Sequence, residues 1–415
     1  MSAAPASMRR LAPLLGALAM FGAFSIDTVF PAFPQIGAQF GAGRVAMQQT
    51  ISAYLVAYAA MSLWHGALSD AFGRRRVILV GITVFALASA GCALSTSLPM
   101  LVGFRVLQGL SAGVGLIVGR AVIRDLFDGA EAQRLMSQVS MIFGIAPAVA
   151  PVIGGWLIGW HRWPAIFWFL MLFGGALLLA VARWLPETHP AVKRHPLRAR
   201  RLWQTYSTII GDAQFRRLAL ASAFNFCALF LLIASAPALV LDHFRLGEQG
   251  FGWFFIPMIS GMMAGAFASG RFAGRMDGRR QVRMGFGLGV AGALALLAYA
   301  LSVDHLELPY GVVPVMVMAF GIALVSPITT LMGLDLFPAM RGAAASVQAF
   351  VALAMNAFIA GVVSPMLSDS APLLASGSLL LAMLGWLAWR LALRRADRVP
   401  PPPQDGENYE PLDEL

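Results

Sequence analysis

Long apolar stretches separated by short polar ones run along the chain from residue 11 to residue 394. Most of these stretches approach or exceed the roughly 20 residues that an α-helix needs to cross the hydrocarbon core of a bilayer. The pattern therefore predicts an all-α membrane protein with twelve spans. They cover residues 11–34, 48–69, 77–96, 99–123, 137–160, 164–186, 216–241, 250–273, 283–303, 310–333, 343–367 and 372–394.

A longer polar stretch after span 6 divides the spans into two groups. We expect a first six-helix bundle at 1–186, a basic linker at 187–215 and a second six-helix bundle at 216–395. Residues 396–415 contain a run of prolines and then turn acidic, a composition typical of a disordered tail.

Composition supports lipid as the surrounding solvent. Apolar residues make up 59% of the chain and charged residues 12%, against about 25% charged in soluble domains. The net charge of +10 would also fit a nucleic-acid-binding protein. The basic residues, however, lie in short loops between spans, where they orient a membrane protein, so we expect no nucleic-acid partner.

The distribution of Lys and Arg predicts the orientation. With the N-terminus inside, the outer loops hold only Arg44, Arg162 and Arg245, and the inner segments hold most of the other basic residues, including the 183–217 and 271–283 clusters. Cytoplasmic loops of membrane proteins carry the excess of positive charge. Both termini are therefore expected in the cytoplasm, which agrees with an even number of spans.

Two short sequences recur six spans apart. The stretch 66–75 after span 2 is similar to 270–280 after span 8, and Asp-Leu-Phe at 125–127 ends span 4 as it ends span 10 at 335–337. Two parallel, pseudo-symmetric halves explain this spacing, because the same element then returns at the same place in each half.

Other kinds of chemistry find little support. The two cysteines, Cys92 and Cys227, are too few for a four-ligand zinc site, and the histidines show no metal-ligand spacing. We find no phosphate-binding loop, polar catalytic cluster or appended soluble domain. The sequence therefore predicts no metal, no catalytic residue and no cofactor.

One acidic residue lies deep inside a predicted span. Asp27 is in span 1, whereas the other 19 acidic residues lie near span ends, in loops or in the tail. An ionised carboxylate in hydrocarbon is costly, so such a residue is by default functional, with a structural salt bridge as the alternative. Arg105 in span 4 lies at a similar depth, roughly 9 Å below the outer surface at 1.5 Å per residue. Direct contact between the two is left open.

Other polar side chains inside spans are candidates for the substrate site. Gln108 shares a helix face with Arg105, and there it either orients the guanidinium or joins two helices. Tyr54 and Tyr58 share one face of span 2, where they line a cavity or simply pack. Asn225 and Asn356 are further candidates, since an amide in lipid needs a partner.

Several of these residues stand in recognisable patterns. The loop from Gly66 to Arg76 resembles the G-x-x-x-D-R-x-G-R-R signature of the major facilitator superfamily, with Ala71 in place of an Arg. Residues 105–109 resemble its R-x-x-Q-G signature. Residues 146–155 resemble the G-x-x-x-G-P-x-x-G-G signature of the antiporters, with Ala at both early glycine positions. Residues 25–34 resemble the Bcr/CflA-type drug exporters.

The resemblance implies a fold, a function and roles for particular residues. It implies two six-helix bundles around an alternately accessible cavity, and export of chloramphenicol- or bicyclomycin-like drugs in exchange for protons. Asp27 and Arg105 would couple transport to the proton gradient. An inner gate that favours the outward-open state would contain Asp70, Gly73, Arg74 and Asp125, with Asp70 facing span 11 near Gly342. The antiporter-signature helix would contain Pro147, Pro151, Gly154 and Gly155.

The remaining expectations follow from this reading. The partners are a small-molecule drug or metabolite, protons and the lipid bilayer, and the protein is expected to act as a monomer in the bacterial inner membrane. An uptake symporter for a metabolite is the alternative on the same fold, which the span 5 signature disfavours. A membrane-embedded enzyme or receptor is the second alternative.

Overall fold

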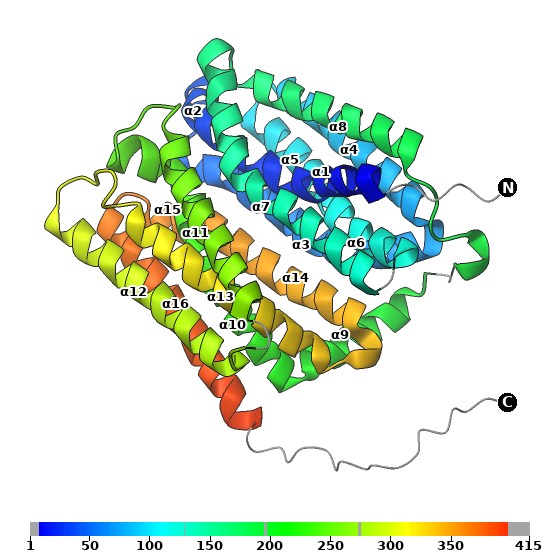
Figure 1. The fold of residues 1–415 in the computed structure, drawn as a ribbon. Helices are drawn as coiled ribbons and strands as arrows, with labels where there is room; N and C mark the ends of the chain where they lie inside the picture. Colours follow the sequence, from blue (N-terminus) through cyan, green and yellow to red (C-terminus); the bar gives the residue numbers. More distant parts are fainter. Residues whose placement is uncertain (1–7, 128, 195–196, 273–274, 397–415) are drawn as a thin grey trace.

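The computed structural model describes residues 8–127, 129–194, 197–272 and 275–396 (Figure 1). All regular secondary structure in these residues is helical, and twelve segments are long and apolar enough to cross a membrane, as predicted. The first six spans are formed by α1 (Met8–Asp27) with η1 (Phe30–Ala32) and α2 (Phe33–Phe40), α3 (Arg44–Phe72), α4 (Arg74–Ala93), α5 (Leu98–Ala112) with α6 (Val114–Leu126), α7 (Gly129–Trp160) and α8 (Pro164–Trp184).

The last six spans repeat this arrangement. They are formed by α10 (Ala213–Ala234), α11 (Phe251–Phe272), α12 (Gly278–Ser302), α13 (Val313–Asp335), α14 (Arg341–Phe358) with η5 (Ile359–Val363) and α15 (Ser364–Leu367), and α16 (Ala371–Ala396). Short helices η3 (Ala238–His243) and η4 (Pro338–Met340) lie between spans. Figure 1 shows the two groups of six side by side.

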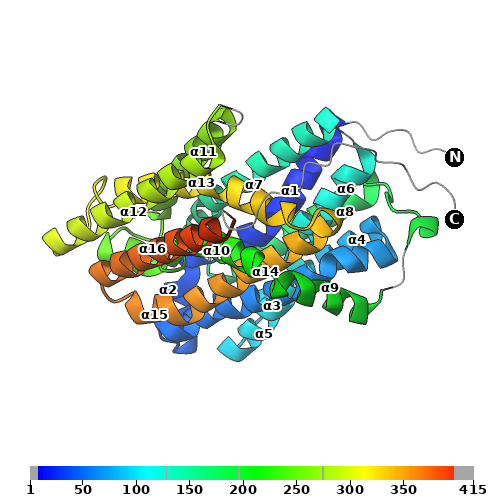
Figure 2. The ribbon, with the colours of Figure 1, turned by 90° about the horizontal axis from the view of Figure 1, so that it is seen from below.

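The two halves meet along two pairs of helices. α3 packs along α14, and α7 packs against α11. We call the end of the bundle where α1 begins and α16 ends the terminal end, and the opposite end the far end. α7 and α11 diverge toward the terminal end (Figure 2), where a cavity of about 1400 Å³ lies between α7 on one side and α11 and α13 on the other.

Span 1 is broken toward the far end of the bundle. Helix α1 ends at Asp27, and the chain continues through the 3-10 turn η1 before α2 begins. Pro31 explains the position of the break, because it lacks the N–H that would bond to the carbonyl of Asp27 four residues earlier. The Thr28 hydroxyl instead donates to the carbonyl of Phe24 at 2.5 Å. The break places Asp27 at the end of a helix inside the bundle.

The linker between the halves contains structure that hydropathy did not predict. The short turn η2 (Ala191–Lys193) is followed by α9 (Ala199–Gly211), which packs against α10 and α14. The Tyr206 hydroxyl on α9 donates to the carbonyl of Leu63 on α3 at 2.6 Å. Burial, and secondly the charge of Asp70, raise the pKa of Tyr206, so its hydroxyl remains a donor. The linker thus contacts both halves.

Candidate functional site

A buried guanidinium organises the centre of the first half. Arg105 on α5 is 1% exposed, and its Nη1 donates to the carbonyl of Ser25 at 3.1 Å and to Gln108 Oε1 at 2.7 Å. The i, i+3 spacing on α5 places the amide beside the guanidinium. Gln108 in turn donates to the hydroxyl of Ser89 on α4 at 2.8 Å. The predicted pair is therefore one link in a network that joins α1, α4 and α5.

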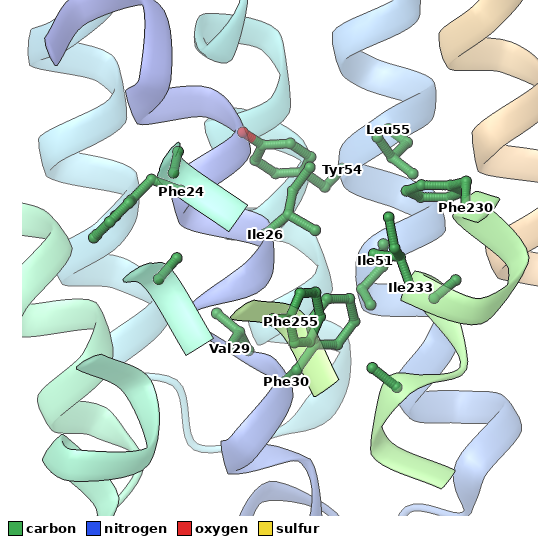
Figure 3. Packing of buried hydrophobic residues seen from close by; sticks show 14 of the residues in the cluster. Phe24, Ile26, Val29, Phe30, Ile51, Tyr54, Leu55, Phe230, Ile233 and Phe255 are labelled. Carbon is green, nitrogen blue, oxygen red and sulfur yellow. The ribbon is translucent and has the colours of Figure 1, made fainter. Parts of the chain in front are cut away.

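Tyr54 closes this network from α3. Its ring lies under the guanidinium of Arg105, 4.4 Å from Cζ to the ring centroid, a cation–π arrangement. Its hydroxyl donates to the carbonyl of Gly22 at 2.8 Å and lies 2.8 Å from the Ser25 hydroxyl, pointing at α1 in Figure 3. Tyr58 contacts the Tyr54 ring edge-on at 6.3 Å between centroids. The two tyrosines share one face, as their spacing predicted.

Asp27 lies beside this network without joining it. The residue is 5% exposed and has no hydrogen-bond or ion-pair partner among the residues that the structure describes. Arg105 donates through Nη1 to Ser25 and Gln108, whereas its Nε and Nη2 have no hydrogen-bond partner among the described residues. The sequence predicted that Asp27 and Arg105 lie at a similar depth. The bond from Arg105 to Ser25, two residues before Asp27, agrees with this prediction. The open question of direct contact is answered for this conformation: Asp27 and Arg105 do not form an ion pair among the described residues.

The two asparagines join helices of the second half. Asn225 on α10 donates to the carbonyl of Ile322 on α13 at 3.3 Å, and Asn356 on α14 accepts from the Cys227 thiol at 3.4 Å. Both are buried, at 3% and 7% exposure. Each amide thus has the protein partner that its place in lipid requires. A role in binding substrate stays a prediction.

The predicted gate residues meet at the terminal end. Arg74 forms ion pairs with Asp70 and with Asp125, the latter at 3.1 Å, and its backbone N–H donates to Glu187 at 2.9 Å. Gly73 has φ +98°, a conformation that disfavours any residue with a Cβ, and a side chain there would collide with Glu187. The cluster therefore ties α3, α4 and α6 to the start of the linker.

The expected contact between this cluster and the second half is not made in this conformation. Asp70 forms no hydrogen bond to Gly342 among the described residues, and its partner is Arg74. In the second half, Asp335 pairs with Arg341 at 2.9 Å. The predicted contact was assigned to the outward-open state, whereas here the cavity opens at the terminal end.

The antiporter-signature helix lies between the halves. α7 contains Pro147 and Pro151 and still continues to Trp160. A Cβ at Gly154 would collide with the carbonyl of Thr28 in the broken part of span 1. A Cβ at Gly155 would lie 2.7 Å from the carbonyl of Glu248, just before α11. The two glycines thus let α7 approach span 1 on one side and the second half on the other.

Sequence reasoning did not find the contacts that close the far end. Arg44, at the start of α3, pairs with Asp242 at 2.9 Å and with Asp369 at 3.1 Å, both in the second half. We call these two ion pairs the far-end latch. Gln48 donates to the carbonyl of Ala234 at 2.7 Å just below it. The clue was available, since Arg44 is one of only three basic residues in the loops that are predicted to face outside.

Further bonds and an apolar layer complete the closure. Gln49 donates to the carbonyl of Gly361 at 2.8 Å, and Ser52 donates to the carbonyl of Ala357 at 2.9 Å. Figure 3 shows apolar side chains of the two halves in the same layer, among them Ile51, Leu55, Phe230, Ile233 and the stacked pair Phe30 and Phe255, whose centroids are 6.3 Å apart. The site with Asp27 and Arg105 is therefore sealed from the far end.

Comparison with known proteins gives a consistent result. The family model described as Major Facilitator Superfamily matches residues 15–365. The MFS-type transporter YdgK of Bacillus subtilis is 31% identical over 85% of this chain and 88% of its own. The bicyclomycin resistance protein homolog of Haemophilus influenzae is 27% identical over 86% and 89%, and the chloramphenicol resistance protein of Pseudomonas aeruginosa is 29% identical over 78% and 76%.

Solved structures agree on the fold. The crystal structure of a D-xylose-proton symporter superposes with a TM-score of 0.71 at 14% identity, over 91% of this chain and 97% of that one. The partially occluded inward-open xylose transporter XylE from E. coli gives a TM-score of 0.70 at 13% identity, over 95% and 100%. At these identities the likeness concerns the fold alone.

Proposed function

The chain belongs to the major facilitator superfamily of membrane transporters, and we propose that it exports small hydrophobic drugs in exchange for protons. The names of the relatives support this choice, because they include bicyclomycin and chloramphenicol resistance proteins. The antiporter-signature helix supports export over uptake, since its Gly155 lies where α7 meets the second half. The proposed energy source is the proton gradient, with no cofactor, in a protein that acts as a monomer.

The observation that carries the proposal is the state of Asp27. Its carboxyl group is buried at a break in span 1, two residues after the Ser25 carbonyl that accepts from Arg105, and it forms no ion pair among the described residues. An unpaired charge at such depth is costly, so gain or loss of one proton changes the energy of this conformation. We assign Asp27 as the proton carrier and Arg105, with Gln108 and Tyr54, as the group that positions the surrounding helices.

The proposed cycle uses the two ends of the molecule in turn. We place the terminal end in the cytoplasm of a bacterium, by the inner-membrane orientation that the arginines predict. A drug enters the cavity between α7 and α11 while the far-end latch is closed. The terminal end then closes and the far end opens. A proton from outside binds the Asp27 carboxylate, the drug leaves, and the protonated carrier returns to release the proton inside.

Reconstitution with a defined pH gradient tests the function. The purified chain is placed in liposomes, and uptake or release of radiolabelled chloramphenicol is measured with the gradient in either direction. We expect the drug to move against the proton flow and to collapse part of the gradient. Movement of drug and protons in the same direction would instead establish a symporter. Sidedness is fixed separately, by labelling a cysteine placed at Arg198, which should resist impermeant reagents in intact cells.

A further inference from the structure

The cavity at the terminal end combines an apolar wall with positively charged side chains. It lies between the first part of α7 and the facing parts of α11 and α13, and we call it the vestibule. Five of the 21 methionines in the chain line it: Met136, Met141, Met262, Met263 and Met276. Methionine is flexible and polarisable, so such a wall adapts to apolar groups of different shapes.

Two arginines line the same vestibule. Arg271 is in the last turn of α11, and Arg275 follows in the turn before α12. Neither forms a hydrogen bond through its guanidinium or an ion pair with a carboxylate among the described residues. Both are exposed to the space that the diverging helices leave. Two cations beside one apolar wall match a ligand with an anionic group on a hydrophobic body.

The acidic residues at the same end do not neutralise these arginines. Asp70 and Asp125 pair with Arg74, and Asp335 pairs with Arg341. The other described acids of this end are Glu131, Glu187, Asp212 and Asp277; Glu187 accepts from the Arg74 backbone, and Asp212 and Asp277 cap the starts of α10 and α12. None of these carboxylates lines the vestibule, whose buried polar side chains are Gln281 and Ser269, bonded to each other at 2.7 Å.

We propose that the vestibule selects amphipathic anions, that is, hydrophobic molecules with a sulfonate, phosphate or carboxylate group, over hydrophobic cations. Arg271 and Arg275 bind the anionic group, and the methionine-lined wall holds the apolar body. The inference rests on the proposed export function and names a substrate class for it. A charge-assisted hydrogen bond discriminates strongly, whereas an apolar wall alone accepts all three charge types. The occupant to which we commit is a transported substrate, not a resident phospholipid.

Three probes with one ring system test the selection. Naphthalene-1-sulfonate, naphthalene-1-sulfonamide and naphthylmethyl-trimethylammonium differ in permanent charge, so a pH gradient does not redistribute them across the bilayer. Proton-coupled transport of each is measured in liposomes of phosphatidylcholine. We expect the sulfonate to have a KM at least about tenfold below that of the cation. In the Arg271→Gln, Arg275→Gln double variant this preference should disappear, while the KM of the sulfonamide stays within about twofold.

Matched variants separate local binding from general effects of charge. Arg283→Gln removes one positive charge from the same end outside the vestibule, and it should leave the preference unchanged. The Arg271→Lys, Arg275→Lys variant should restore part of it. A double variant that transports the sulfonate as well as the parent does would overturn the proposal.

Two further outcomes are informative. Transport of the sulfonamide with no preference for the sulfonate would overturn the charge selection and leave the export function standing. If none of the three probes, nor chloramphenicol, moved against protons, the export function itself would fail. Adding phosphatidylglycerol to the liposomes tests the lipid alternative. If the double variant changed binding of that lipid and not the KM of the sulfonate, the arginines would serve the membrane and our assignment would be wrong.

Discussion

Asp27 and Arg105 are both buried charged residues of the first half, and they differ in how many contacts hold them in place. Arg105 is held by Ser25, Gln108 and the ring of Tyr54, so its position is fixed. Asp27 has no such partner among the described residues. Arg105 is held by its contacts and Asp27 is not. This arrangement suits a site in which only the carboxyl group of Asp27 gains and loses a proton.

Replacing Asp27 by Asn tests the carrier assignment. The amide has nearly the same size and cannot titrate, so gradient-driven drug export should fall by more than tenfold. Drug-for-drug exchange needs no proton and should stay within about twofold of the parent, which also shows that the variant is folded. Asp27→Glu should retain part of the export. Full gradient-driven export by the Asn variant would assign the proton to another group.

Substitutions of Tyr54 separate its ring from its hydroxyl. Tyr54→Phe removes the bond to the Gly22 carbonyl and should lower the free energy of unfolding by about 0.5–1.5 kcal/mol. Tyr54→Leu also removes the ring under Arg105, whose desolvated cation–π contact is worth about 2 kcal/mol, so the loss should be larger. Thermal unfolding in detergent measures both. Equal losses for Phe and Leu would show that the ring contact contributes nothing.

The sequence could predict a contact within the site only where helical spacing places two residues on the same face. The faces shared by Arg105 with Gln108, and by Tyr54 with Tyr58, follow from i, i+3 and i, i+4 positions. The bond from Arg105 to Ser25 crosses from one span to another and has no such signal in a single sequence. Asn225 and Asn356 illustrate the same limit, because spacing cannot tell a cavity-facing amide from one bonded to the neighbouring helix.

At the level of whole elements, hydropathy located all twelve spans but not their ends. α7 begins at Gly129, before the predicted 137, because its polar first turns lie outside the stretch that hydropathy can recognise. The basic helix α9 was missed for the same reason. The break in span 1 could have been read from Pro31 and Pro34, since proline removes the helical N–H.

The close approach of α7 to the second half leads to a prediction for Gly155. A Cβ there would lie 2.7 Å from the carbonyl of Glu248, and such overpacking costs about 1–3 kcal/mol. We expect this contact to be lost when the far end opens, so Gly155→Ala should shift the equilibrium about fivefold to 150-fold toward the far-end-open state. Gly144→Ala on the same helix is the control, because its Cβ meets no atom within 4 Å.

Electron–electron distance measurements can follow this equilibrium. Spin labels on cysteines at His161 and Glu307, both exposed at the far end of opposite halves, report whether that end is open. The native Cys92 and Cys227 are replaced by Ser beforehand. A Gly155→Ala distribution that matches that of Gly144→Ala would show that α7 does not seal the far end.

For the whole molecule, composition and internal repeats predicted the class of protein, and the structure added its conformation. The six-span repeat and the basic linker indicate two halves but not which end is open, because neither feature reports contacts between the halves. That information lies in contacts between distant residues, such as Arg44 with Asp242 and Asp369. Oppositely charged residues near span ends are common, so only coordinates reveal which of them meet.

The far-end latch should therefore set the balance between the two conformations. All three side chains are about half exposed or more, so each ion pair contributes about 0.2–1 kcal/mol, and more at low salt than at high salt. Arg44→Gln should shift the population toward the far-end-open state by about twofold to thirtyfold, measured with the same pair of spin labels.

Arg162→Gln is the control, because it removes an exposed far-end arginine that has no ion-pair partner among the described residues. Exchange of the charges, with Arg44→Asp and Asp242→Arg combined, should restore part of the closed population. Unchanged distances in Arg44→Gln at low salt would mean that the polar bonds of Gln48, Gln49 and Ser52 and the apolar layer below hold the far end closed without the latch.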